Sequence, residues 1–234
     1  MTYTPPTAEQ VLALKVSAGI GELAQSERFA AASADMVEAI VEGAGQFAAG
    51  VFAPLALSGD REGAQLVDSM VRLPEGYSEA YKAYVEQGWN AVAGPEHFGG
   101  QGLPFSLAAC VLENLGAANM GFTLLPMLTV GAIDAIEKHG SESQKATYLA
   151  KLISGEWPGT MNLTEPHAGS DVGALRTTAT PIGTDDFGGE HAGKYLIKGT
   201  KIFITWGEHE LADNIVHLVL ARTPGAPEGS RGIS

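Results

Sequence analysis

Residues 164–171 are the part of the sequence that best suits ligand binding. They are Thr164-Glu-Pro-His-Ala-Gly-Ser-Asp171, and they follow Thr160-Met-Asn-Leu, a short stretch that predicts a strand. A strand that enters a turn with a proline and a glycine exposes backbone N–H groups, which suit phosphate or the oxygens of an aromatic ring. The hydroxyls of Thr164 and Ser170 add short donors. The alternative is an ordinary turn in which Glu165 or Asp171 caps local N–H groups, and composition alone favours it.

Metal binding and nucleophilic catalysis find little support in the sequence. Glu165, His167 and Asp171 are of metal-ligand types, but a loop broken by glycine and proline is a poor scaffold for a metal. The six histidines lack metal-ligand spacing, and the chain has no GxSxG, GxxxxGK[ST], GxGxxG or CxxC motif. The single cysteine, Cys110, lies in an apolar run that predicts a buried helix position. We therefore expect no metal and assign no catalytic residue.

A second segment combines an aromatic residue with a hydroxyl side chain. Phe203-Ile-Thr-Trp-Gly207 places an aromatic ring and a hydroxyl two residues apart. On one face of a strand, such a pair can stack on a flat ring and hydrogen-bond its edge. Alternatively Phe203 is a core residue and Thr205 an exposed one, which the pattern alone favours.

Glycines and a proline in Gly94-Pro-Glu-His-Phe-Gly-Gly-Gln-Gly-Leu103 predict a constrained structural loop between helices.

The elements that must position these segments fall into two classes along the chain. Up to about residue 155 the apolar periodicity predicts helices, over residues 36–51, 78–88, 105–115, 121–138 and 141–153. Ser78 is expected to cap the second of these and Ser141, with Gln144 three residues on, the last. The most apolar stretch, residues 121–136, is too short and too interrupted to predict a membrane span.

After Gly155, β-branched residues predict strands over residues 194–198, 201–205 and 214–222. Gly199-Thr200 is expected to form a hairpin turn, and residues 184–193 and 224–232 to form loops. Helices followed by strands without alternation indicate an α+β fold. We predict an N-terminal all-helical domain at residues 1–155 and a domain of strands at residues 156–234.

Charge excludes some partners. The net charge of −13 disfavours nucleic acid and anionic membrane surfaces. It does not exclude an anionic small ligand, because backbone N–H groups can bind one locally. The N-terminus shows no basic region followed by an apolar one, so no secretory signal is expected. We expect a cytoplasmic protein.

Taken together, the three segments resemble motifs of the acyl-CoA dehydrogenase family. The loop at residues 94–103 is similar to a motif of that family's N-terminal helical domain. Leu163-Thr-Glu-Pro-His-Ala-Gly-Ser-Asp171 resembles its flavin and substrate signature, and Lys201-Ile-Phe-Ile-Thr-Trp-Gly207 resembles its second flavin segment. The likeness covers about residues 35 to 234. Residues 208–214 and 228–234 look most like the subgroup that contains 3-methylmercaptopropionyl-CoA dehydrogenases.

The resemblance implies a fold, a function and a site. It implies that residues 156–234 are part of a β-barrel-like middle domain, which in the family stands between the N-terminal helices and a C-terminal helical bundle. It implies FAD-dependent α,β-dehydrogenation of an acyl-CoA thioester, a homo-oligomer, and an electron-transferring flavoprotein as electron acceptor. It implies that Ser170 also reaches the acyl-CoA. By position, the residues implied to contact FAD are Met161, Leu163, Thr164, Ser170, Phe203, Ile204 and Thr205.

Two departures from the family pattern bear on this expectation. The family usually has tryptophan where this chain has Phe203, so stacking is kept while an indole N–H donor is lost. The family's C-terminal helical bundle, which carries or adjoins its catalytic glutamate, is expected to be absent from these 234 residues. Glu165 belongs to the binding motif and is not assigned as the base. The alternatives are an acyl-CoA oxidase, or a non-catalytic truncated remnant or assembly subunit.

Overall fold

The computed structural model describes residues 3–182 and 193–234. The chain forms two compact units, one of Met1–Gly159 with Glu208–Val216 and the other of Thr160–Gly207 with His217–Ser234. The first is mainly helical and the second holds short strands, so the α+β fold class is confirmed. The predicted domain boundary at residues 155 and 156 stays a prediction.

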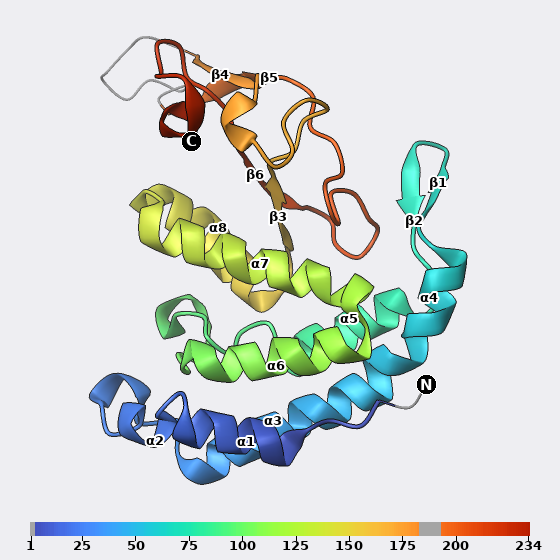
Figure 1. Cartoon of the computed structure of the whole chain (residues 1–234), viewed down its shortest axis with the longest axis vertical. Coiled ribbons are helices and arrows are strands. Elements are labelled where there is room, and N and C mark those ends of the chain that lie inside the picture. Colours follow the sequence, from blue (N-terminus) through green and yellow to red (C-terminus); the bar gives the residue numbers. More distant parts are fainter. Residues whose placement is uncertain (1–2, 183–192) are drawn as a thin grey trace. The chain divides into compact units, whose positions relative to one another are not determined.

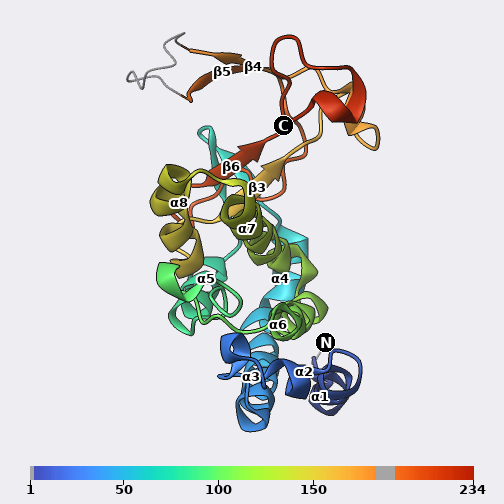
Figure 2. The ribbon, with the colours of Figure 1, turned by 90° about the vertical axis from the view of Figure 1, so that its left-hand side faces the viewer.

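The helical unit is built from eight α-helices in its described residues (Figure 1). They are α1 (Thr7–Val16), α2 (Ile20–Leu23), α3 (Ala34–Phe47), α4 (Ala56–Glu62), α5 (Tyr77–Glu86), α6 (Phe105–Ala118), α7 (Met120–His139) and α8 (Glu142–Ser154). Helix α6 packs between α3 and α7, and α8 packs on α7 (Figures 1 and 2). A short hairpin of β1 (Gln65–Val67) and β2 (Met70–Arg72), which the sequence analysis did not predict, follows α4.

Helix ends show which sequence signals determined the structure. The predicted capping box is present at α8, where Ser141 Oγ accepts from Gln144 N and Gln144 Oε1 accepts from Ser141 N. Ser78, in contrast, does not cap α5. The N-cap of that helix lies two residues earlier, at Gly76, whose φ of 88° lies in the left-handed region that favours glycine. The predicted cap at Ser78 was therefore wrong.

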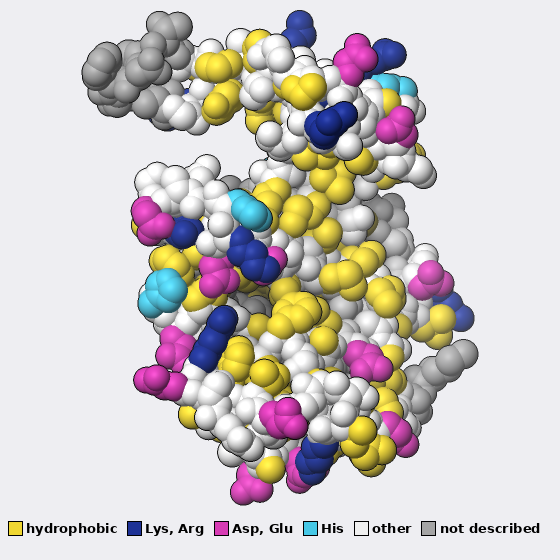
Figure 3. Space-filling view, turned by 60° about the vertical axis from the view of Figure 1, so that its left-hand side comes forward, with side chains coloured by type: hydrophobic (Ala, Val, Ile, Leu, Met, Phe, Trp, Pro, Cys, Tyr) yellow, Lys and Arg dark blue, Asp and Glu magenta, His cyan; other side chains and the backbone are white. Residues whose placement is uncertain are grey.

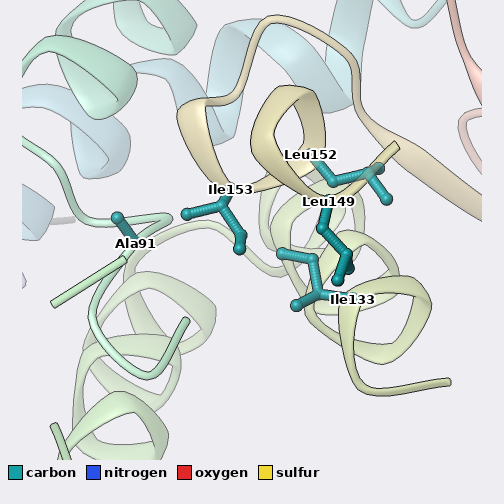
Figure 4. Packing of buried hydrophobic residues seen from close by; sticks show 5 residues of the cluster. All are labelled: Ala91, Ile133, Leu149, Leu152 and Ile153. Carbon is teal, nitrogen blue, oxygen red and sulfur yellow. The ribbon is translucent and has the colours of Figure 1, made fainter. Parts of the chain in front are cut away.

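The core of the helical unit consists of apolar side chains from several helices. Aromatic rings stack in its interior, with the ring centroids of Phe52 and Phe122 at 4.4 Å and those of Tyr77 and Phe122 at 4.6 Å. A second cluster joins α7, α8 and the loop after α5 (Figure 4), and its buried members are Ala91, Ile133, Leu149, Leu152 and Ile153. Burial of this apolar surface stabilises the unit.

Two helical runs, Ala34–Glu62 and Met120–His139, are long and apolar enough to cross a membrane by length and composition. The core helix of a soluble protein passes the same test, so this is weak evidence for a span. On the face in Figure 3, acidic and basic side chains are interspersed with apolar ones over the helical unit. The expectation of no membrane span stays a prediction.

Short paired backbone segments organise the described part of the second unit. Strand β4 (Thr178–Pro181) pairs antiparallel with β5 (Tyr195–Lys198), and β3 (Gly159–Asn162), which starts at the unit boundary, neighbours β6 (Val216–Val219). Beyond β6, Ala221 and Ser234 exchange two backbone hydrogen bonds of 2.8 and 3.0 Å. The loop predicted at residues 184–193 lies, up to residue 192, outside the described residues.

One predicted strand was wrong. Residues 201–205 form no strand, and β5 pairs with β4 rather than across a turn at Gly199-Thr200. Phe203 and Trp206 both have φ of 55°, a left-handed conformation that a regular strand excludes. Gly199 instead passes close to Thr177, and a Cβ on residue 199 would lie 2.8 Å from the Thr177 Cα. The chain therefore needs glycine there for close packing.

Candidate functional site

The first candidate segment is a tight turn directly after β3. Glu165 N donates to Ala168 O at 3.0 Å and Ala168 N donates to Glu165 O at 3.1 Å, which leaves Pro166 and His167 at the tip. A proline at this place suits a turn because its φ is fixed near the required value. The strand-then-turn prediction for residues 160–168 is confirmed.

The side chain of Glu165 is buried and makes several polar contacts. Its Oε2 accepts from Arg176 N at 2.7 Å, and its Oε1 accepts from Thr177 N at 3.0 Å and from Lys201 Nζ at 3.0 Å. His167 Nε2 lies 3.4 Å from Oε2. Glu165 therefore accepts from backbone N–H groups, but these lie eleven and twelve residues further along the chain and are not the local groups of an ordinary turn.

These contacts explain the electrostatics of Glu165. Burial alone would raise the pKa of the carboxyl group, because it disfavours the charged form. Hydrogen bonds from Thr177, Arg176 and Lys201 outweigh burial and lower the pKa to about 2. A carboxylate with so low a pKa is a poor general base at neutral pH. Glu165 therefore has a structural role in this turn.

The second candidate segment, residues 201–207, lies beside this turn. Ile202 N donates to Thr164 O at 3.0 Å, and Lys201 Nζ donates to Leu163 O at 2.8 Å. The two segments, which the sequence separates by more than thirty residues, are thus brought together. The Phe203 ring follows this junction and is 87% exposed, so its alternative assignment to the core was wrong.

The other predicted contact residues lie along the same two segments. Met161 is half-buried in β3, while Ser170 is exposed just after the turn. Thr205 is exposed and Ile204 is half-buried, and Ile204 O accepts from Gly207 N at 3.0 Å, which closes a turn. Because this stretch is a turn, the predicted strand alternation does not place Phe203 and Thr205 on one face. The ligand-binding roles of all these residues stay a prediction.

The third segment, residues 94–103, is a constrained loop, as predicted. Gly102 N donates to Gly94 O at 2.9 Å and Leu103 N donates to Val92 O at 3.0 Å. A Cβ at Gly100 would lie 2.0 Å from Gly94 O, so only glycine fits. Among the residues that the structure describes, no group of three His, Cys, Asp or Glu could hold a metal ion.

Sequence reasoning missed two cations of the second unit. Lys201 was predicted to lie in a strand. Its role as the charged partner of the buried Glu165 carboxylate was not predicted. The Arg222 guanidinium donates to Leu175 O at 3.1 Å, to Pro227 O and Gly229 O at 3.0 Å each, and to Gly173 O. It thereby ties the short helical turn after Ser170 to the C-terminal loop.

A family model described as "Acyl-CoA dehydrogenase, N-terminal domain" matches residues 34–156. The chain belongs to the acyl-CoA dehydrogenase family. This result confirms the resemblance inferred from the three motifs.

Individual relatives agree with this assignment. The chain is 48% identical, over its full length, to a 3-methylmercaptopropionyl-CoA dehydrogenase of Ruegeria pomeroyi and spans 38% of that protein's length. The structure of butyryl-CoA dehydrogenase from Megasphaera elsdenii matches with a TM-score of 0.64 at 27% identity, over 85% of this chain and 46% of the other. A structure described as an FAD complex of PigA matches with the same TM-score, identity and coverage.

Proposed function

We propose that this chain forms the flavin-binding and acyl-CoA-binding part of an acyl-CoA dehydrogenase, an enzyme that oxidises the α,β-bond of an acyl-CoA thioester. The observation that carries the proposal is the junction between residues 163–165 and 201–202. It places the Thr164 segment next to the segment that presents the exposed Phe203 ring. A flat ligand with polar edges fits such a pair of segments.

The chemistry of the two segments fits FAD. The Phe203 ring and the partly exposed Leu163 side chain offer apolar surface, and Thr164, Ser170 and Thr205 offer hydroxyl donors. When bound, FAD supplies the acceptor for the hydride that leaves the β-carbon. We propose that FAD is held by Met161, Leu163, Thr164, Ser170, Phe203, Ile204 and Thr205, and that Ser170 also contacts the acyl-CoA.

We propose that, in the reaction, this chain binds and orients FAD and the acyl-CoA. Removal of the α-proton needs a carboxylate with an accessible lone pair and a suitable pKa. Glu165 has neither, since its oxygens already accept from Arg176, Thr177 and Lys201. We therefore propose that Glu165 is not the base and that, as the resemblance to the family implies, the base belongs to or adjoins the family's C-terminal helical bundle.

The partners implied by the family are part of the same proposal. We propose that an electron-transferring flavoprotein reoxidises the bound flavin, that the enzyme is a homo-oligomer, and that it acts in the cytoplasm. Support comes from the resemblance of residues 163–171 and 201–207 to the family's flavin motifs, and from the identity of 48% to a named acyl-CoA dehydrogenase.

The test uses the protein that contains this chain, purified without added flavin. We expect FAD absorbance bands, and enoyl-CoA formation from a panel of short acyl-CoAs, including 3-methylmercaptopropionyl-CoA, with an artificial electron acceptor. Turnover with oxygen as efficient as with that acceptor would indicate an oxidase instead. A protein with no releasable FAD and no enoyl-CoA product would contradict the proposal.

A further inference from the structure

The two proposed flavin segments are joined by an ion pair whose members lie outside the proposed contact set. Lys201 Nζ lies 3.0 Å from Glu165 Oε1 and donates to Leu163 O at 2.8 Å. The side chains of Glu165 and Lys201 are only 2% and 10% exposed. A pair so well shielded is little affected by salt, unlike the exposed ion pairs of a protein surface.

The carboxylate of Glu165 suits this place better than a neutral side chain would. It accepts from two backbone N–H groups, those of Arg176 and Thr177, and from an ammonium group. An amide has one accepting oxygen, and its NH2 group would face a donor. The charge of Glu165 is therefore needed for the junction, and Lys201 compensates it.

The backbone conformation of Phe203 depends on contacts made by neighbouring residues. Its φ of 55° is unfavourable for a side chain of this size, and its ring is 87% exposed. Packing of the ring within this chain therefore does not hold the backbone in place. The restraints on neighbouring residues include the turn closed by Gly207 N on Ile204 O. Those that tie this segment to the Thr164 segment are the Ile202 N to Thr164 O hydrogen bond and the contacts of Lys201.

We infer that Glu165 and Lys201 are positioning residues, which set the place of Thr164 relative to Phe203 and thereby prepare the flavin site. This inference rests on the proposed function. It assigns neither residue to contact with FAD or substrate. Lys201 bridges the residues on both sides of Thr164, so loss of its ammonium group releases both segments together.

The first test is a double-mutant cycle in FAD affinity. The flavin-stripped protein is titrated with FAD as wild type, Lys201→Met, Glu165→Gln and the double variant. We expect each single variant to weaken FAD binding about tenfold, since hydrogen bonds to charged groups contribute more than neutral ones. The double variant should be weakened less than the product of the two single effects. Lys198→Met, which removes an exposed lysine on β5, is the control and should bind as wild type does.

The second test needs no flavin. Amide hydrogen exchange of the flavin-stripped variants should rise in residues 161–168 and 201–206 together, while α6 and α7 exchange as in the wild type and thus report an intact fold. Unchanged exchange in either segment would overturn the inference. So would a lower melting temperature with unchanged FAD affinity, because that result indicates a structural role alone. If the wild-type protein binds no FAD, the proposed function is wrong. Hydrogen exchange of the variants then tests by itself whether Glu165 and Lys201 position the two segments.

Discussion

At Glu165 a single carboxylate accepts hydrogen bonds from Arg176 N, Thr177 N and Lys201 Nζ. These donors hold the charged form although the side chain is buried. The pKa of about 2 is below the usual value of 4.5. Protonation is therefore harder in the folded state than in the unfolded state, and Glu165 stabilises the fold above the unfolded pKa.

This shift predicts a pH dependence. The stability from Glu165 is fully present above about pH 4.5 and is lost as the pH falls towards 2. Glu165→Gln should lower the free energy of unfolding at pH 7 by roughly 2 kcal/mol, and the difference from wild type should shrink between pH 4.5 and 2. Chemical denaturation at several pH values measures it, with the exposed Glu228→Gln as control. An equal difference at pH 7 and pH 2.5 would refute the assignment.

Thr164 predicts an effect on flavin binding. Thr164→Val keeps the shape but removes a hydroxyl donor, whereas the neighbouring Leu163→Val changes only apolar surface. In the full-length enzyme we expect Thr164→Val to weaken FAD binding by about 0.5–1.5 kcal/mol more than Leu163→Val. Flavin titration of both variants measures this difference. Equal dissociation constants would count against the role of Thr164.

Among the elements, the approach of Gly199 to Thr177 is a sensitive point of the second unit. A Cβ at residue 199 would lie 2.7 Å from the Thr177 Cβ, whereas one at Gly169 would meet nothing within 4 Å. Gly199→Ala should therefore destabilise the protein by about 1–3 kcal/mol, and Gly169→Ala should have little effect. Thermal unfolding of the two variants compares them. The prediction fails if Gly199→Ala unfolds at the wild-type temperature.

The helices could be predicted because their signals are local. Ser141 and Gln144 form the predicted capping box, and the apolar run at residues 121–138 became α7. The segment at residues 201–205 could not be predicted in the same way. Its β-branched residues favour a strand, but Ile202 N bonds to Thr164 O, a residue far away in sequence, and Phe203 adopts a left-handed conformation.

The site could be predicted only in part. Residue types alone favoured an ordinary turn at residues 164–171 and a core position for Phe203. Only the resemblance to the acyl-CoA dehydrogenase family linked the two segments to one flavin site. The hydrogen bonds that join the two segments depend on tertiary structure. The partnership of Glu165 with Lys201 therefore could not be read from spacing along the chain.

For the whole molecule, the chain spans 38% of the length of its 3-methylmercaptopropionyl-CoA dehydrogenase relative. The resemblance implies that the catalytic glutamate and part of the flavin contacts belong to the family's C-terminal bundle. We therefore expect the 234-residue chain, expressed by itself, to show no acyl-CoA dehydrogenation and to retain little FAD. Product analysis after incubation with acyl-CoA, added FAD and an artificial electron acceptor tests this. Enoyl-CoA formed at rates proportional to the amount of chain would contradict it.

The central claim is that residues 161–170 and 201–206 form one flavin site. The most direct measurement is amide hydrogen exchange of the protein containing this chain, before and after saturation with FAD. The account predicts that FAD slows exchange in both segments together, with no comparable change in the helices α1 and α3. Protection confined to other parts of the chain, or to only one of the two segments, would contradict it.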